Sequence, residues 1–408
     1  MTEHGLAYFL NAASLAIIGF SLNLLLLRAR NQPFYWPLAG ALLSIALLIC
    51  QPWLRDLPLT LRQLALLLAL PALYLLPPCL WLYVQGLTSS SPWQFRREHA
   101  KHFALASFAL LIAIAGALLP AEIRDGILGA GSDQVLSTVS AGLRYLVYGL
   151  LTVTFVLVIA WCGLAGYYLV AIYQQLRRYR AALRQIFAST ERQELHWIAG
   201  LLAIVGIVWL LATLALLYDN LFGPLQIAPA FKQGFILLLV WSLASWGLRQ
   251  KPGFAQLDLT DHDTVAVIDT LDSSPSSMPS DSKYQRSALH AELADKIAAK
   301  LHQAMVEDQL FLDASLSLPK LAKHVTTSPS YVSQTLNERL GVNFFDFINR
   351  YRVAAAKEQL KSTDATALEV AMNVGFNAKS SFYTAFKKET GMTPQQYRQN
   401  TAATQSLR

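Results

Sequence analysis

The first 250 residues consist of long apolar runs separated by short polar stretches, and this pattern predicts a bundle of membrane-spanning helices. A transmembrane helix needs about 20 predominantly apolar residues. Because three prolines lie within the third run, we expect a kink there. We therefore expect residues 1–251 to form a seven-helix transmembrane domain. The seven apolar runs cover residues 6–27, 35–54, 61–86, 102–120, 144–173, 195–218 and 229–248.

The pattern changes near residue 287, after which apolar residues recur at helical spacing among many charged ones. Apolar residues four positions apart predict a first helix over about 288–305. Two pairs of short helices follow, each joined by a tight turn, and a long helix over about 344–360 connects the pairs. Two short helices joined by a tight turn form the helix-turn-helix pattern. The predicted fold class is all-α, with a seven-helix membrane domain followed by two tandem helix-turn-helix units over residues 287–400.

The two halves are joined by an acidic stretch that is rich in serine and proline. Residues 252–282 contain six aspartates and no lysine or arginine. Such a composition cannot bury enough apolar surface to fold alone. We expect a flexible linker over residues 252–286, and a short tail over residues 401–408.

Lysine and arginine are unevenly distributed between alternate connections of the membrane half, which predicts its orientation. Twelve lie in the connections after the first, third, fifth and seventh runs, against three to five in the alternate connections. Cytoplasmic loops carry the excess of these residues. The N-terminus is therefore expected outside, and the C-terminal domain in the cytosol. The expected location is the inner (cytoplasmic) membrane, with several passes.

Residues that would carry catalysis or bind metal are sparse. The three cysteines, Cys50, Cys79 and Cys162, lie in apolar runs without paired spacing, which argues against a disulfide framework or a cysteine zinc site. No phosphate-binding loop and no hydrolase or metalloprotease motif occurs in the sequence. We expect no enzymatic activity, no metal and no cofactor.

Three ionisable residues lie at the expected outer ends of the fifth, sixth and seventh runs: Arg144, Asp219 and Lys232. Ionisable groups inside a membrane are costly and often functional. At the end of a span they can also reach the interface, where they need no partner. The sequence leaves both interpretations open, and the functional one is a pocket for a small-molecule or membrane ligand.

The C-terminal region resembles the AraC family of bacterial transcription regulators. The resemblance rests on the run from Val374 to Lys388 (VGFNAKSSFYTAFKK), on the following Gly-Met-Thr-Pro, and on Ser328 to Gln334 (SPSYVSQ). The run from Asn343 to Arg352 resembles the subgroup that is joined to multi-span membrane domains. The resemblance to the family covers residues 287–400 and says little about the membrane half.

The resemblance implies a monomer with two DNA-reading heads, whose recognition helices enter successive major grooves of promoter DNA. The first head offers small serines where other members carry larger side chains, so its specificity is expected to be weaker. The implied base-contacting residues are Ser330, Ser333, Gln334, Lys379, Ser380, Tyr383 and Thr384. The candidate phosphate contacts are Arg339, Arg350, Arg352, Lys387, Lys388 and Arg398.

Three functions are consistent with this organisation. The first is a one-component transcription regulator that senses an external or membrane signal and binds promoter DNA from the membrane. The second is a tethered factor released by proteolysis in the linker, and the third is a transporter or membrane enzyme with a regulatory DNA-binding domain. The expected partners are double-stranded DNA, the lipid bilayer, RNA polymerase and a second copy of the chain.

Overall fold

The computed structural model is all-α, as predicted, and divides into two compact units. It describes residues 3–54, 59–89, 93–128, 139–189, 196–222, 229–250 and 283–406. Within these residues the single extended pairing is an isolated antiparallel bridge between Phe187 and Ser317. The first unit comprises Met1–Leu176 and His196–Pro252, and the second comprises Arg177–Leu195 and Gly253–Arg408. Residues Arg177–Leu195, expected in a loop of the membrane half, thus belong to the second unit.

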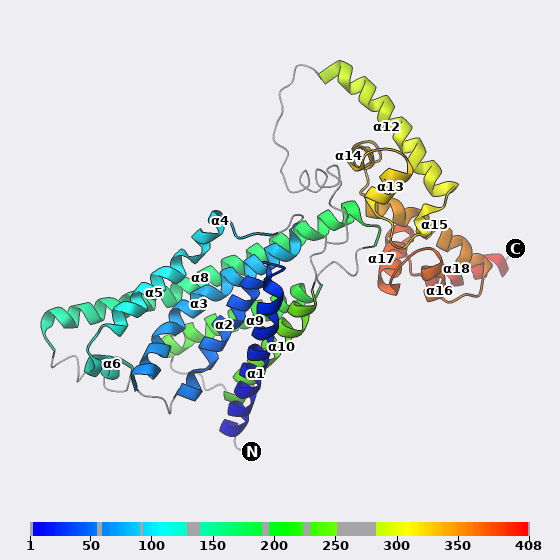
Figure 1. The fold of residues 1–408 in the computed structure, drawn as a ribbon. Helices are drawn as coiled ribbons and strands as arrows, with labels where there is room; N and C mark the ends of the chain where they lie inside the picture. Colours follow the sequence, from blue (N-terminus) through cyan, green and yellow to red (C-terminus); the bar gives the residue numbers. More distant parts are fainter. Residues whose placement is uncertain are drawn as a thin grey trace. The chain divides into compact units, whose positions relative to one another are not determined.

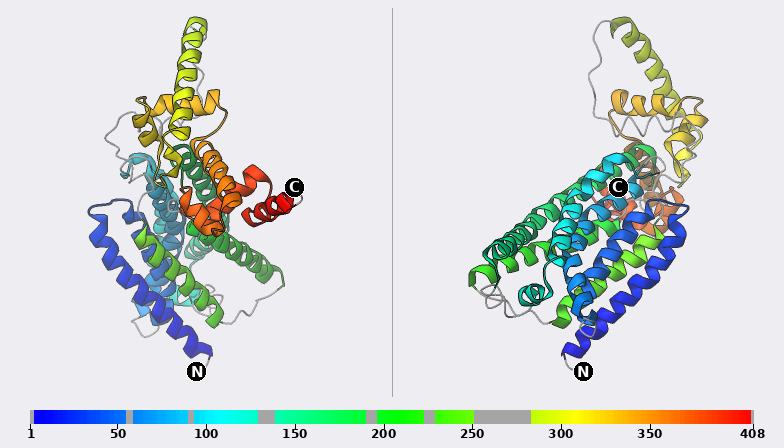
Figure 2. Two further views of the ribbon diagram at one scale, coloured as in Figure 1. Left: turned by 90° about the vertical axis from the view of Figure 1, so that its right-hand side faces the viewer. Right: turned by 60° about the vertical axis from the view of Figure 1, so that its left-hand side comes forward.

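The first unit is a bundle of long helices, in which α1, α2, α3 and α10 lie side by side (Figures 1 and 2). Its long helices are α1 (Glu3–Ala29), α2 (Tyr35–Ile49), α3 (Leu59–Thr88), α5 (Ala104–Ala117), α8 (Ala141–Ile186), α9 (His196–Phe222) and α10 (Pro229–Arg249). Its shorter elements are η1 (Gln51–Leu54), α4 (Arg97–Ala100), η2 (Lys101–Phe103) and α6 (Ala121–Leu128). The last turns of α8, from Arg177 on, belong to the second unit.

Five helical segments in the described part are long and apolar enough to cross a membrane, fewer than the seven predicted. They are Gly5–Ala29, Ala65–Thr88, Arg97–Ala117, Ala141–Ile186 and Pro229–Arg249. The predicted span 35–54 fails because its helix, α2, has 15 residues, which is about 22 Å against a hydrocarbon core of about 30 Å. In the predicted span 195–218, the described apolar stretch is Ile198–Ile207.

The outward surface of the first unit carries many large apolar side chains. Phe20 is 70% exposed, Leu238 is 68% exposed and Leu118 is 81% exposed. Exposed apolar side chains in such number are expected where a protein contacts lipid or another protein. Together with the five long apolar helices, this surface indicates that the first unit is anchored in a membrane.

The helix α3 continues through Pro71, Pro77 and Pro78, and side chains of α8 compensate for part of the lost backbone bonding. Proline has no N–H, so Pro77 cannot donate to the carbonyl of Leu73 four residues earlier. The indole Nε1 of Trp161 donates to that Leu73 carbonyl at 2.9 Å. Pro77 therefore opens a bonding position that ties α3 to α8.

The second unit contains α12 (Lys283–Val306), η3 (Leu310–Leu312), α13 (Leu318–His324), α14 (Pro329–Gln334), η4 (Thr335–Arg339), α15 (Phe344–Ser362), α16 (Ala367–Asn373), α17 (Lys379–Thr390) and α18 (Pro394–Ser406). It has two separate apolar cores, one for each helix-turn-helix head. The long α15 contributes Phe344, Phe347 and Ile348 to the first core. It contributes Val353 and Leu360 to the second. One helix therefore holds both heads.

The ends of these helices follow the signals in the sequence. The side chain of Ser328 accepts a bond from the Tyr331 N–H and caps α14, with Pro329 in the first turn. The side chain of Asn343 caps α15 in the same way, by accepting from the Asp346 N–H at 2.8 Å. Gly391 ends α17 in the left-handed conformation, with a φ of 76°.

The start of α16 is a reciprocal capping box, and it predicts loss of stability in acid. The Thr366 N–H donates to the Glu369 carboxylate at 2.7 Å, and the Glu369 N–H donates to the Thr366 hydroxyl at 3.2 Å. The bond from the Thr366 N–H lowers the pKa of Glu369 from its ordinary value. Because the folded state has the lower pKa, its stabilisation is present above the unfolded pKa and is lost as the pH falls through the folded one.

We expect Thr366→Ala to reduce the unfolding free energy of the second head by about 1 kcal/mol. We expect Glu369→Gln to remove the part of the acid sensitivity that comes from this carboxylate. Amide hydrogen exchange of α16, measured between pH 3 and pH 7 in the full chain, checks both changes. An acid profile in Glu369→Gln that matches the parent would contradict the assignment.

Candidate nucleic-acid interface

Each helix-turn-helix unit makes its tight turn with one residue in the left-handed conformation. In the second head this residue is Gly375, with a φ of 91°, between α16 and α17. In the first it is Thr326, with a φ of 54°, between α13 and α14. Left-handed backbone suits glycine and is costly for a β-branched residue. The second turn is therefore the less strained of the two.

The second helix of the second head, α17, has its buried and its exposed residues on opposite faces. Phe382 and Phe386 are buried in the second core. The opposite face exposes Lys379, Ser380 and Thr384. Its base-contact candidates thus share one face, and all are exposed except Tyr383, which is half-buried. The Lys379 ammonium lies 5.4 Å from the centroid of the Tyr383 ring, which orients the lysine.

The corresponding helix of the first head, α14, presents shorter polar groups. Ser330 and Ser333 are half-buried, whereas Gln334 is exposed and donates to the Glu338 carboxylate at 3.0 Å. Tyr331, which is 43% exposed on this helix, was not among the residues expected to contact DNA. The neighbouring Val332 lies in the first core, which leaves Tyr331 on the exposed side of the helix. Its place in the first turn of α14, two residues after Pro329, is the signal that could have identified it.

Four of the six candidate phosphate contacts are exposed cations: Arg339, Arg350, Lys387 and Lys388. Three of them form ion pairs: Arg339 with Asp295 at 2.5 Å, Arg350 with Glu389 at 3.8 Å, and Lys388 with Asp346 at 2.7 Å. Exposed ion pairs contribute little, so a phosphate can replace the carboxylate at small cost. Arg398 is half-buried and donates to the Ala365 carbonyl, which leaves it less available.

The prediction that Arg352 contacts phosphate is wrong, because this side chain is fully buried. Its Nε donates to the Phe311 carbonyl at 2.8 Å and its Nη2 to the Asp313 carbonyl at 2.9 Å. Its Nη1 donates to the Ala188 carbonyl at 3.1 Å and to the Ser189 hydroxyl at 3.2 Å. Arg352 therefore has a structural role: its hydrogen bonds join α15 to two segments that are distant in the sequence.

One of those segments, Phe187–Ser189, continues the chain from the end of α8 and packs into the first head. The Ala188 N–H donates to the Leu316 carbonyl at 3.1 Å, and Ala188 is buried in the first core. The Arg184 guanidinium lies 5.8 Å from the centroid of the Phe345 ring. We call Phe187–Ser189 the docking segment. The sequence analysis missed it, because a short apolar stretch after an arginine-rich helix end resembles an ordinary loop.

The segment between η3 and α13 links the first head to the second. The Asn377 amide, from the turn before α17, donates to the Ala314 carbonyl at 3.1 Å. A Cβ placed on Gly375 would lie 2.6 Å from the Phe311 carbonyl oxygen and 2.8 Å from that of Leu312. The two heads are therefore in close backbone contact, and their mutual orientation depends on a glycine at this turn.

The three candidate ligand-sensing residues are not brought into one described cluster. Arg144 is half-buried near the start of α8, and its Nη2 donates to the Val139 carbonyl at 3.2 Å. Lys232 is exposed on α10. Asp219 belongs to α9, and its side chain lies outside the described residues.

The C-terminal region is similar to known helix-turn-helix proteins. Residues 321–400 match the family described as "Helix-turn-helix domain". An HTH-type transcriptional regulator of Staphylococcus aureus (strain COL) is 38% identical over 99 residues, which are 24% of this chain and 13% of that protein. The regulatory protein PocR of Salmonella typhimurium is 34% identical over 101 residues, which are 25% of this chain and 33% of PocR.

Among solved structures, the C-terminal domain of AraT, a response regulator from Geobacillus stearothermophilus, is 32% identical. The match covers 25% of this chain and 84% of that domain, with a TM-score of 0.23. The chain spans at most a third of the staphylococcal regulator and of PocR, and each of these matches covers about a quarter of this chain.

Proposed function

Because the C-terminal part of this chain is an AraC-type helix-turn-helix domain, we propose that the chain is a membrane-embedded, one-component transcription regulator. The observation that carries the proposal is the joining of two features in one chain. One is a unit of long apolar helices with an apolar outer surface. The other is a pair of helices, α14 and α17, that each bury one face in a core and present polar side chains on the other.

In this proposal, α14 and α17 enter two successive major grooves. Lys379 is suited to the O6 and N7 atoms of guanine, and Gln334 to the N6 and N7 atoms of adenine. Ser330, Ser333, Ser380, Tyr383 and Thr384 complete the base-contacting set. Arg339, Arg350, Lys387 and Lys388 position the phosphates without specifying sequence. The longer side chains of α17 make the second head the more selective one.

We place residues 1–251 in the inner membrane as a bundle of several spans, with the N-terminus outside and the C-terminus in the cytosol. The linker is 252–286, the DNA-binding domain 287–400 and the tail 401–408. The uneven distribution of lysine and arginine supports this orientation. RNA polymerase and a second copy of the chain are the further partners we propose, since a linked second site raises affinity through effective concentration.

A signal would reach the DNA through the docking segment. The chain leaves α8 and enters the first head directly, where the Arg352 side chain donates to Ala188 and Ser189. A shift in the population of two arrangements of the spans would therefore act on the group that also bonds Phe311 and Asp313, beside the second head.

The same contact argues against release by proteolysis as the main mechanism. Cleavage within residues 252–286 would cut the acidic linker but leave the docking segment buried in the first core. The domain would then stay attached without a covalent link. No described feature of the first unit favours transport or catalysis, so we propose regulation as the function.

The test is sequence-specific DNA binding by the full chain in lipid nanodiscs, selected from randomised duplexes. We expect one enriched motif with two half-sites, and a loss of affinity for it of about 5- to 150-fold in Lys379→Ala, equivalent to about 1–3 kcal/mol for a base contact. Lys296→Ala is the matched control, because Lys296 is an exposed lysine of α12 paired with Glu292. Equal affinity of the parent and Lys379→Ala would contradict the reading role of α17.

A further inference from the structure

A cavity in the first unit lies between two small apolar clusters. One cluster contains Tyr74, Ala109 and Leu157, and the other contains Leu119 and Val147. The cavity has a volume of about 200 Å³ and is lined by α3, α5, α6 and α8. An apolar cavity of about 150 Å³ accommodates benzene, so this space suits an apolar body of about six to eight carbon atoms.

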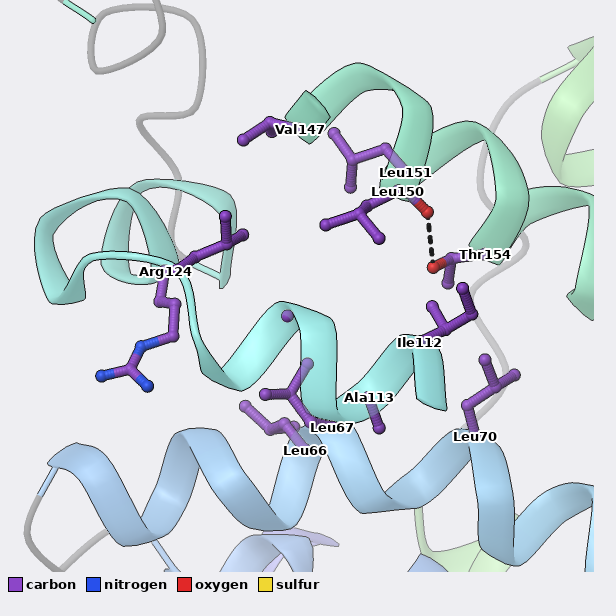
Figure 3. Close-up of a pocket in the computed structure, with 12 residues that line it drawn as sticks. Leu66, Leu67, Leu70, Ile112, Ala113, Arg124, Val147, Leu150, Leu151 and Thr154 are labelled. Carbon is purple, nitrogen blue, oxygen red and sulfur yellow. Dashed lines mark hydrogen bonds between the residues drawn. The ribbon is translucent and has the colours of Figure 1, made fainter. Parts of the chain in front are cut away.

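The lining is apolar apart from one charged side chain. Figure 3 shows Leu70 from α3, Ile112 from α5 and Leu150 from α8 around the same space, with Arg124 extending from α6 beside the end of α5. The Thr154 hydroxyl, the other polar side chain of the lining, donates to the Leu150 carbonyl at 2.8 Å. The Thr154 hydroxyl thus has its acceptor within α8, which leaves Arg124 as the polar side chain of the lining that a ligand could contact.

The Arg124 guanidinium has a hydrogen-bond donor left for a ligand. Its Nη1 donates to the Ala117 carbonyl at 2.5 Å. Its Nε is buried and, within the described residues, has no hydrogen-bond acceptor. A buried guanidinium donor without an acceptor is costly, and a carboxylate is the group whose geometry and charge match it best.

The position of the cavity fits the proposed topology. Its residues lie near the start of α3, the end of α5 and the start of α8. The connections at these ends, residues 55–58 and 121–140, are among those poor in lysine and arginine, so we place all three positions at the outer ends of the helices. A ligand from outside the cell would reach Arg124 on α6 without crossing the membrane.

We propose that this cavity is the signal site and that it binds a small monoanionic carboxylate with an apolar body of about six to eight carbon atoms. The proposal rests on the sensory role given to the first unit above. The carboxylate bonds Arg124, and the apolar part fills the space between α3, α5 and α8. An anionic lipid also joins one negative charge to an apolar body, and the experiment distinguishes the two sources.

The experiment is a titration of octanoate into the full chain in nanodiscs of phosphatidylcholine, followed by calorimetry and by the thermal transition of tryptophan fluorescence. All nine tryptophans precede residue 250, so this fluorescence reports on the first unit. We expect saturable binding that octanamide, a neutral molecule of the same length, does not reproduce. Equal binding of octanoate and octanamide would overturn the role of the charge.

Two variants test the site itself. Arg124→Gln should weaken octanoate binding at least about 10-fold, as expected for loss of a bond to a charged group. Ala113→Leu should remove binding by filling the cavity, since Ala113 lies in its lining. Arg97→Gln is the control, because Arg97 is an exposed arginine outside the lining. A parental affinity for octanoate in both Arg124→Gln and Ala113→Leu, with an unchanged thermal transition, overturns the proposal.

The lipid source is tested by adding phosphatidylglycerol to the nanodiscs. Octanoate affinity that is independent of phosphatidylglycerol supports a soluble carboxylate. Competition by phosphatidylglycerol overturns it in favour of a lipid. DNA binding is measured on the same samples: octanoate binding without DNA binding would contradict the proposed function alone, and DNA binding without octanoate binding would contradict this site alone.

Discussion

Replacing Arg352 by methionine is expected to destabilise the DNA-binding domain by about 3 kcal/mol or more. The substitution keeps an apolar stem of similar length but removes donors from the carbonyls of Phe311, Asp313 and Ala188. A buried acceptor left without a partner costs about 1–3 kcal/mol. We expect amide exchange in α15 to become roughly 100-fold faster, because each factor of ten corresponds to about 1.4 kcal/mol.

Exchange measured by mass spectrometry on the full chain checks this result. Arg350→Met is the control, because Arg350 lies on the same helix, is exposed and forms only a loose ion pair with Glu389. The tryptophan fluorescence transition of the first unit should be unchanged in both variants. Slow exchange in Arg352→Met, equal to that in Arg350→Met, would show that this guanidinium does not hold the domain together.

Replacing Gly375 by alanine is expected to disrupt the contact between the two heads. The new methyl group would lie 2.6 Å and 2.8 Å from two backbone carbonyl oxygens, at a φ of +91°. Neither carbonyl belongs to a flexible side chain, so the backbone must shift, at a cost of about 2 kcal/mol or more from the clash and the left-handed conformation. Cooperative DNA binding by the two heads should fall more than binding by either head.

The measurement compares a DNA site carrying both half-sites with sites carrying one. In Gly375→Ala, we expect the advantage of the complete site to fall at least about 10-fold, which corresponds to 1.4 kcal/mol of lost coupling. Gly391→Ala is the control, because Gly391 also has a positive φ but meets no atom within 4 Å at its Cβ position. An undiminished advantage of the complete site in Gly375→Ala would show that the heads orient independently.

The sequence predicted the elements whose signals are local. The side chains of Ser328 and Asn343 mark helix starts, and the backbone of Gly391 marks a helix end. The apolar runs of α1 and α3 are each long enough to cross a membrane. Hydropathy alone overestimated the number of spans. The predicted run 35–54 continues past α2, but its last residues form the short η1 (Gln51–Leu54) instead of continuing the α-helix.

The long-range contacts were beyond a single sequence. Arg352 looks like any cation of an amphipathic helix, and only the arrival of the docking segment and of the Phe311 carbonyl makes its burial favourable. In the sequence, Arg124 is one charge in the connection between the fourth and fifth apolar runs, and nothing local indicates that α6 lies beside the end of α5. Both depend on segments that come together from distant parts of the chain.

The central claim is that the intact chain reads promoters while it remains in the membrane. Genome-wide DNA occupancy of the full-length protein, with fractionation of the same cells, tests it most directly. We predict discrete promoter peaks, with the whole chain recovered in the membrane fraction. Peaks carried only by a soluble C-terminal fragment, or no peaks with or without octanoate, would contradict it.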